Sequence, residues 1–351
     1  MGDAGARAAP KQVRRATLST PSESPPDAQR AASPRAAHPS NPGDRHARSL
    51  ARSLLPIGLL AVAWGLNWPI LKMGVTEIAP LTFRALTLPF AALCMLAWAR
   101  WSGASLRVPR GWWPRVLILA AFSITGWNGL VLFGVRELAS GRSAILAYTM
   151  PIFATAMAIV LLKEPMSARK IVGFALGMSG MALLLGDDAR HLANAPRGAW
   201  LILAAAFVWA IGTVLLRKWQ PPMPQSALSG WMMLVGCVPL ALVAPLFDDG
   251  GLAQFAHLST RAWLAIGYNI FVAGTIANLT WFTLVRTLPV TVSSMSSLPI
   301  PVVGVFSGML LLGERPGSAE WAALALVVGA LVAVMWPGGE RVARDRAADP
   351  G

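Results

Sequence analysis

The stretch TGWNGLVLFGVRELASGRSAILAYTMPIFATAMAIVLLKE, at residues 125–164, decides the fold because the chain contains a second version of it. Residues 275–314 align with it without a gap, at a constant offset of 150. Polar residues and prolines are the informative matches, since leucine and alanine recur by chance in apolar sequence. They pair Thr125, Asn128, Arg136, Ser143, Pro151 and Glu164 with Thr275, Asn278, Arg286, Ser293, Pro301 and Glu314. Two copies of one hydrophobic unit are a common architecture of secondary transporters.

The composition indicates a membrane protein. The chain is 55% hydrophobic and 13% charged, whereas soluble domains contain about 25% charged residues. Apolar stretches of about 20 residues are typical of transmembrane helices, and we predict an all-α integral membrane protein with about ten of them. They cover roughly 54–72, 80–99, 113–134, 142–162, 168–186, 198–216, 226–246, 262–284, 289–312 and 318–336.

The predicted helices divide into two repeats of five. A shorter match at an offset of 145, which pairs Trp64 with Trp209, supports this division. Because each repeat has an odd number of spans, the second must enter the membrane from the opposite side. The predicted parts are a disordered tail at 1–53, a first repeat at 54–186, a second repeat at 198–336 and a short tail at 337–351.

The charges of the loops predict the orientation. The even-numbered loops hold ten basic residues and one acid, Glu164, whereas the odd-numbered loops mix seven basic residues with eight acids. Since basic loops stay in the cytoplasm, we predict that the even loops and both termini are cytoplasmic.

The net charge of +14 does not indicate nucleic-acid binding. Nine of the thirty basic residues lie in the first 53 residues and three in the C-terminal tail, and most others flank apolar segments, where they set topology or meet lipid head groups. The expected partners are a small-molecule substrate and the lipid bilayer, without nucleic acid, and the chain is expected to be a monomer or a homodimer.

Neither a cofactor nor a metal site is predicted. All four histidines lie in the tail or in loops, and Cys94 and Cys237 lack a CxxC spacing. The sequence also lacks the common catalytic motifs. The pairs Asp187-Asp188 and Asp248-Asp249 could hold a metal-bound diphosphate, but adjacent residues on a helix point in different directions, which favours solvated loop acids.

Polar residues inside the predicted helices are the candidate substrate-binding residues. The repeat places Asn128 and Asn278 at the same depth, and Asn67 shares a helix face with Trp64. Trp209, the counterpart of Trp64 in the second repeat, could stack on a substrate. Hydrogen bonds between helices are the alternative role for the asparagines.

Pro151 and Pro301 lie near the centres of two predicted helices. A proline removes one backbone hydrogen bond and leaves the carbonyl four residues earlier free, here at Ala147 and Ser297. Paired helix breaks at equivalent depths indicate a binding site, so Tyr148 and Ser297 are further candidates. A purely structural kink is the alternative.

Arg84 is the one charge well inside an apolar run. It could attract a carboxylate or phosphate of the substrate. The alternative is that its long side chain extends to the membrane interface.

These segments together resemble a known family. GRSAILAYTMP at 141–151 with LLKEP at 161–165, and SSLPIP at 296–301 with LGERP at 312–316, are similar to the ends of two EamA domains, and WGLNW at 64–68 is similar to an opening. The resemblance implies the drug/metabolite transporter superfamily, with ten helices in two inverted EamA repeats. It further implies export of amino acids or similar metabolites across the bacterial inner membrane. Near the position matching Arg84, the second repeat has Ser229 and Gly230. Only the first repeat therefore carries a cation that could recognise a charged substrate group.

The resulting hypothesis is a multi-pass carrier that works by alternating access, not an enzyme. Two alternatives remain open: an intramembrane enzyme acting on a lipid-linked substrate, and a membrane scaffold without transport. The missing catalytic constellation disfavours the enzyme, and the paired helix breaks disfavour the scaffold.

Overall fold

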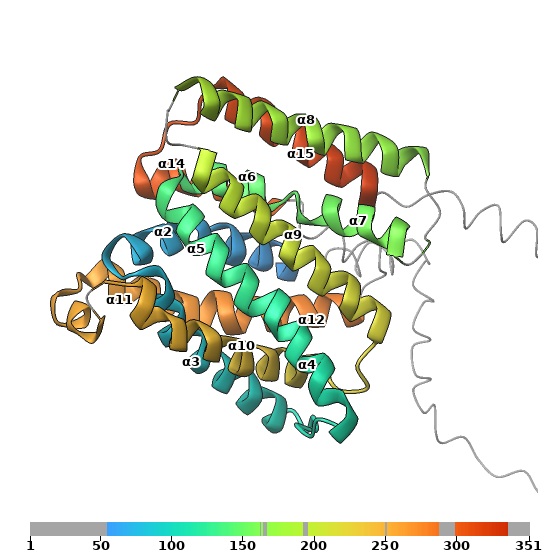
Figure 1. Cartoon of the computed structure of the whole chain (residues 1–351), viewed down its shortest axis with the longest axis vertical. Coiled ribbons are helices and arrows are strands. Elements are labelled where there is room, and N and C mark those ends of the chain that lie inside the picture. Colours follow the sequence, from blue (N-terminus) through green and yellow to red (C-terminus); the bar gives the residue numbers. More distant parts are fainter. Residues whose placement is uncertain are drawn as a thin grey trace, which may run out of the picture. The chain divides into compact units, whose positions relative to one another are not determined.

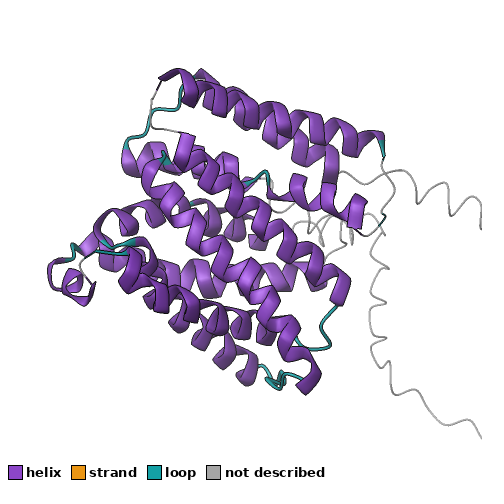
Figure 2. Ribbon diagram, in the orientation of Figure 1, coloured by secondary structure: helices purple, strands orange, loops and turns teal. Residues whose placement is uncertain are grey.

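The computed structural model describes residues 55–161, 163, 167–191, 196–249, 251–287 and 299–335. All of them belong to the second of two compact units, 1–45 and 46–351. The described residues form helices and loops without a strand (Figure 2), which confirms the prediction of an all-helical protein. Among these residues, seven helices are long and apolar enough to cross a membrane and three apolar helices are shorter, against about ten spans predicted for the whole chain.

The helices follow the order of the two repeats. The first repeat contains a helix at 55–65, α2 (Asn67–Glu77), α3 (Pro80–Trp101), η1 (Arg110–Trp112), α4 (Trp113–Ala120), η2 (Ala121–Gly126), α5 (Trp127–Glu137), α6 (Ser140–Ala147), α7 (Met150–Leu161) and α8 (Ala168–His191). The second contains α9 (Pro196–Trp219), α10 (Gln225–Phe247), η3 (Gly251–His257), α11 (Thr260–Gly267), η4 (Tyr268–Ile276), α12 (Ala277–Thr287), α14 (Pro299–Leu312) and α15 (Ser318–Met335).

The two repeats interlock, because helices of one pack against their counterparts in the other. Figure 1 shows α8 beside α15 at one end of the bundle and α3 beside α10 at the other, and both pairs are in extensive contact. The first turn of α3 is hydrogen-bonded to Asp248, directly after α10, so these two helices run antiparallel. Antiparallel counterparts are the arrangement that two inverted repeats require.

Small residues allow the repeats to approach closely. A Cβ atom added at Gly304 of α14 would lie 2.9 Å from the Cβ of Ala144 of α6, and one added at Gly180 of α8 would lie 3.3 Å from the carbonyl oxygen of Ala323 of α15. Glycine at such contacts is typical of helix packing in membranes, where van der Waals contact replaces the hydrophobic effect as the driving force.

Both repeats contain a π-helical turn at the same position. The turn η2 interrupts the third helix of the first repeat, and η4 interrupts the third helix of the second. At the offset of 150, residues 121–126 correspond to 271–276, within η4. A π turn inserts a residue into the helix and leaves backbone carbonyls without their regular partners, and such turns are frequent at functional sites.

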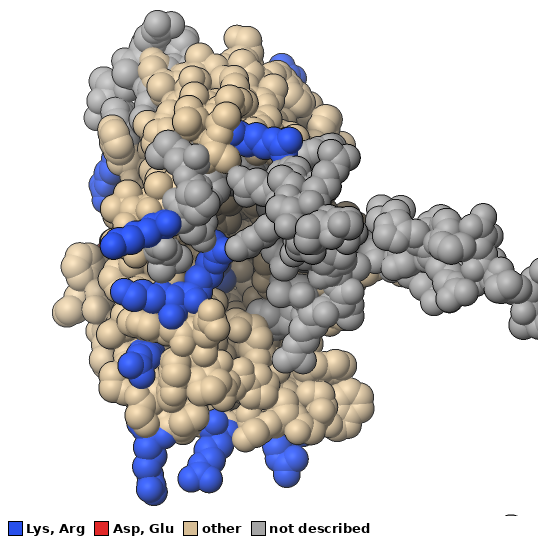
Figure 3. Space-filling view, turned by 90° about the vertical axis from the view of Figure 1, so that its right-hand side faces the viewer, with Lys and Arg blue, Asp and Glu red and all other residues tan. Residues whose placement is uncertain are grey.

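The two ends of the bundle differ in charge. The odd face is defined as the end of the bundle at which α2, α5, α10 and α14 finish. The even face is the opposite end, at which α4 begins and α7 and α9 finish. Figure 3 views the even face, where the described side chains show lysine and arginine and no visible acid. The positive-inside rule therefore supports a cytoplasmic even face.

Two cysteine variants test this orientation. In a background lacking Cys94 and Cys237, we expect Ser167→Cys, before α8, and Ser318→Cys, at the start of α15, to react with an impermeant thiol reagent from opposite sides of the membrane. Intact cells should label only the second, and inverted vesicles only the first. Labelling of both residues from one side would contradict the orientation.

Candidate functional site

The asparagine pair supports the two π-helical turns. The Nδ2 of Asn128 donates to the carbonyl of Ile124 at 2.8 Å, and the Nδ2 of Asn278 donates to the equivalent carbonyl, that of Gly274, at 3.0 Å. It also reaches the Ala273 carbonyl at 3.1 Å. Each amide thus bonds to a backbone carbonyl of the π turn four residues earlier, which is a structural role, and each amide oxygen remains available to a substrate. A role for both residues at a central cavity stays a prediction.

Two aromatic pairs join the repeats at related positions. The rings of Trp64 and Trp281 are 6.0 Å apart, and those of Trp127 and Trp209 are 6.5 Å apart. Each pair connects the first helix of one repeat to the third helix of the other. The Nε1 of Trp64 also donates to the Ala273 carbonyl at 3.3 Å, so this π turn is held by both repeats. The candidate Trp209 therefore lies at an interface between repeats, directly beside η2.

Arg84 is the only buried charged residue in the part of the chain that the structure describes, with 8% of its surface exposed. Its Nη1 donates to the Oδ1 of Asn269 in η4 at 3.0 Å, whereas its Nε has no hydrogen-bond partner. The side chain therefore lies inside the protein between the two repeats, which does not fit an arginine that extends to the membrane interface. A neutral amide cannot compensate a buried positive charge, so the guanidinium is suited to bind an anion.

Sequence analysis missed Asn269, which orients Arg84. Asn269 is 3% exposed, and its Nδ2 donates to the Ala265 carbonyl at 3.0 Å. This bond fixes the amide so that its oxygen points to the guanidinium. The signal was present, since Asn269 is a polar residue inside the apolar run 262–284.

The first helix breaks immediately before Asn67. The chain turns at Leu66, between the helix at 55–65 and α2. Pro69 follows, and because it lacks an N–H group, the carbonyl of Gly65 loses its regular partner. This carbonyl lies 3.4 Å from the Ser307 hydroxyl, which also has the Gly304 carbonyl as an acceptor at 3.0 Å. Asn67 is half-buried, and its Oδ1 is buried without a partner among the described residues. It is therefore a second interior polar group with unused hydrogen-bonding capacity.

Tyr148 lies in a helix break, as the position of Pro151 suggested. α6 ends at Ala147 and α7 begins at Met150, and the Thr149 N–H bonds to the Leu146 carbonyl at 3.2 Å, three residues back. Tyr148 is 5% exposed. Its ring is thus held at the point where the helix changes direction.

Pro301 occupies the same place in α14 as Pro151 does in α7. α14 is described from Pro299, and α7 from Met150, so each proline lies in the first turn after that point. Ser297 and the residues around it lie outside the described residues, so the helix break at Pro301 stays a prediction.

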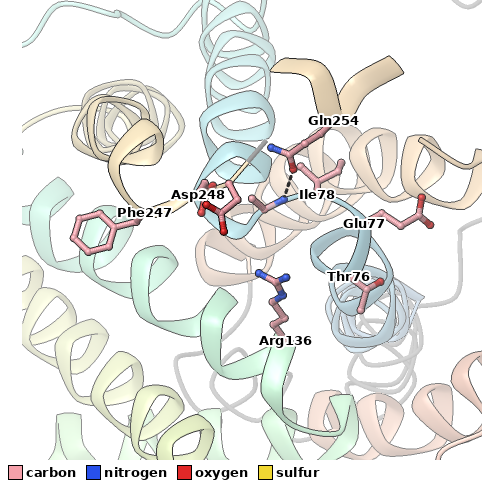
Figure 4. A pocket seen from close by; sticks show the side chains of 9 residues that line it. Thr76, Glu77, Ile78, Arg136, Phe247, Asp248 and Gln254 are labelled. Atoms are coloured by element: carbon pink, nitrogen blue, oxygen red, sulfur yellow. Dashed lines mark hydrogen bonds between the residues drawn. The ribbon is translucent and has the colours of Figure 1, made fainter. Parts of the chain in front are cut away.

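Two cavities open at the odd face. The first, of about 240 Å³, lies between the ends of α2, α5 and α10. Figure 4 shows the Arg136 side chain rising from α5 toward Asp248, and Gln254 accepting the Ala79 N–H. The second, of about 310 Å³, is lined by Lys72, Arg261 and Glu314 among others. Neither Arg84 nor Tyr148 lines either cavity, and no sequence pattern predicted them.

The two repeats also match known proteins. Residues 53–186 and 196–336 each match the sequence model of the EamA-like transporter family. The chain belongs to this family. The resemblance noted in the sequence is thereby confirmed, and the two matched segments correspond to the two halves of the interlocked bundle.

Similar proteins are transporters by name. The chain is 24% identical over 267 residues to "Uncharacterized transporter YoaV" of Bacillus subtilis, covering 76% of this chain and 90% of that protein. It is 28% identical over 290 residues to "Uncharacterized inner membrane transporter YedA" of Escherichia coli K12, covering 81% and 92%. It is 26% identical over 280 residues to "Probable amino-acid metabolite efflux pump" of the same organism, covering 78% and 91%.

A crystal structure shares the fold. It superposes with a TM-score of 0.57 at 21% identity, over 79% of this chain and 96% of the other. Together with the helices long enough to span a bilayer and the inner membrane transporter among its relatives, the family match identifies the chain as a multi-pass inner membrane protein.

Proposed function

We propose that this EamA protein exports small metabolites, with amino acids the first candidates, across the bacterial inner membrane by alternating access. The observation that carries the proposal is Arg84, a buried guanidinium at the junction of the two repeats whose only described hydrogen-bond partner is a neutral amide. The relative named "Probable amino-acid metabolite efflux pump" supports the choice of substrate class.

A carboxylate is the substrate group that fits this position. Planar guanidinium groups bind carboxylates through paired N–H donors, and the free Nε of Arg84 leaves donors available beside the bond to Asn269. Asn67, Asn128, Tyr148, Trp209, Asn278 and Ser297 are proposed to contribute hydrogen bonds and aromatic surface to the remainder of the substrate. No metal or cofactor is needed for such binding.

The helix breaks supply the means of movement. The first and fourth helices change direction at Leu66 and Tyr148, and the third and eighth carry π turns. Backbone departures of this kind in a transporter are tolerated where they line a cavity. Rocking of one repeat against the other would then expose Arg84 to each side in turn, with both termini in the cytoplasm.

The proposal includes the partners and the working unit. The partners are the substrate and the bilayer, not nucleic acid, and the working unit is a monomer or homodimer. Nothing observed favours an intramembrane enzyme, and the relatives carry the names of transporters.

Metabolite profiling tests the proposal and identifies the substrate. The medium of cells that overexpress the protein should gain at least one carboxylate-bearing metabolite relative to cells that express Arg84→Gln at the same level, and a deletion strain should retain that metabolite internally. Identical profiles in all strains would contradict export.

A further inference from the structure

Glu314 connects the two repeats at the odd face. Its carboxylate accepts three hydrogen bonds from the start of α6: from the Ser140 N–H at 2.6 Å, the Ser140 hydroxyl at 2.9 Å and the Gly141 N–H at 3.1 Å. The Nζ of Lys72, in the middle of α2, lies 3.5 Å from the same carboxylate. Glu314 follows α14 in the second repeat, whereas Lys72, Ser140 and Gly141 belong to the first.

This contact is a helix cap supplied from another part of the chain. The first N–H groups of a helix have no partner within the helix, and a side chain at the N-cap position usually accepts from one of them. The N-cap residue of α6 is Ala139, which has no acceptor. Glu314 takes that place, and its negative charge is favoured at the positive end of the helix dipole.

Two further carboxylates of the odd face join the repeats at helix starts. Asp248, after α10, caps α3, whose N-cap residue is Ala79: it accepts from the Thr82 N–H at 2.6 Å and the Thr82 hydroxyl at 2.9 Å. In the opposite direction, Glu77 of the first repeat accepts from the Ser259 N–H at 2.9 Å and the Ser259 hydroxyl at 2.6 Å. Ser259 is itself the N-cap residue of α11 and accepts from the Ala262 N–H at 3.3 Å, so Glu77 holds the capping residue of that helix.

We propose that Glu77, Asp248 and Glu314 form a latch that holds the odd face closed, with Glu314 its principal member. This inference rests on the proposed function, because only an alternating-access carrier must open that face. All three carboxylates cross between the repeats, so the repeats cannot separate at this face without releasing the caps. Water can replace the lost partners of both carboxylate and N–H groups, so that release is reversible.

The position of the latch explains why caps from the other repeat are used. A local serine or aspartate at Ala79 or Ala139 would stabilise α3 or α6 equally in every state. A carboxylate from the other repeat stabilises the helix only while the face is closed, so it favours that one state. Lys72 of the first repeat adds an ion pair to Glu314. Its Nζ also donates to the Leu138 carbonyl, which holds the ammonium group near the start of α6.

Cysteine accessibility tests the latch. Ser143 lies about one turn inside α6 and is fully buried. In purified protein lacking Cys94 and Cys237, we expect Glu314→Gln to increase the rate at which Ser143→Cys reacts with a polar thiol reagent by about tenfold. Glutamine keeps the shape of the side chain but loses the charge that strengthens the cap. Asp249→Asn is the matched control, because Asp249 is an exposed carboxylate of the same face without a hydrogen bond or ion pair to described residues, and it should leave the rate unchanged.

Equal reaction rates with and without Glu314→Gln, in protein that elutes as a single folded peak, would overturn the latch, as would an equal increase in Asp249→Asn. If Glu314→Gln does not fold, Asp248→Asn replaces it: a faster reaction of Ser143→Cys supports the latch, and an unchanged rate overturns it. The assay contains no substrate, so it separates the two proposals: a faster reaction without any measurable export retains the latch and rejects the transport function.

Discussion

Gly65→Ala should strongly reduce the amount of folded protein, whereas Gly58→Ala should not. Both glycines lie in the helix at 55–65. A Cβ atom at position 65 would lie 2.5 Å from the Cβ and Cγ1 of Val303 in α14 and 3.2 Å from the carbonyl oxygen of Ile300, whereas one at position 58 would have nothing within 4 Å. Because the Cβ of Val303 is fixed to its backbone, α14 must move away.

The expected destabilisation by Gly65→Ala is about 1–3 kcal/mol, the typical cost of inserting a methyl group into a packed interior. The contact joins the first helix to the ninth, so the loss should affect the interface between repeats. Gly58→Ala should be neutral or slightly stabilising, since alanine favours a helix by about 0.5–1 kcal/mol over glycine. Thermal unfolding of purified protein, followed by the loss of the monodisperse chromatographic peak, measures both. Equal melting temperatures for the two variants would contradict the close approach of these helices.

Arg84→Gln should weaken the binding of substrates that carry a carboxylate by at least about 30-fold, because removing one partner of a buried charged pair costs about 2–5 kcal/mol. Arg84→Lys keeps the charge but loses the planar arrangement of donors, so we expect an intermediate effect. Neither variant should unfold the protein, since Arg84→Gln removes a buried charge that a neutral amide leaves uncompensated.

The matched control is Arg115→Gln. Arg115 is exposed and stacks on the ring of Trp112 with its guanidinium carbon 4.9 Å from the ring centroid, so its loss should not change transport. Wild type and Arg84→Gln should transport the decarboxylated form of the amino acid, which is an amine, at equal rates. Equal transport of the amino acid itself by wild type, Arg84→Lys and Arg84→Gln would mean that Arg84 has a purely structural role.

The repeat was readable from the sequence because it is carried by residues that are rare in apolar helices, such as Asn128, Pro151 and their counterparts. The π turns were not, since they change the backbone register without a characteristic residue. Asn269 escaped because its repeat position holds Leu119, so comparison of the two halves could not reveal it. The break predicted at Pro301 stays a prediction, because residues 288–298 lie outside the described part of the chain.

The latch could not be predicted from local sequence. Capping residues are normally recognised next to the helix that they cap, but Glu314 is 174 residues from Ser140. Alanine at positions 79 and 139 gives the opposite signal, that of an uncapped helix. Only the packing of one repeat against the other brings these groups together.

Counterflow in proteoliposomes tests the central claim, carrier-type transport of amino acids, most directly. Vesicles containing the purified protein are loaded with a mixture of unlabelled amino acids and diluted into traces of the labelled compounds. We predict that at least one labelled amino acid accumulates transiently above its equilibrium level, and that vesicles with Arg84→Gln do not show this overshoot. Uptake that never exceeds passive equilibration for any amino acid, in vesicles with correctly folded protein, would contradict the account.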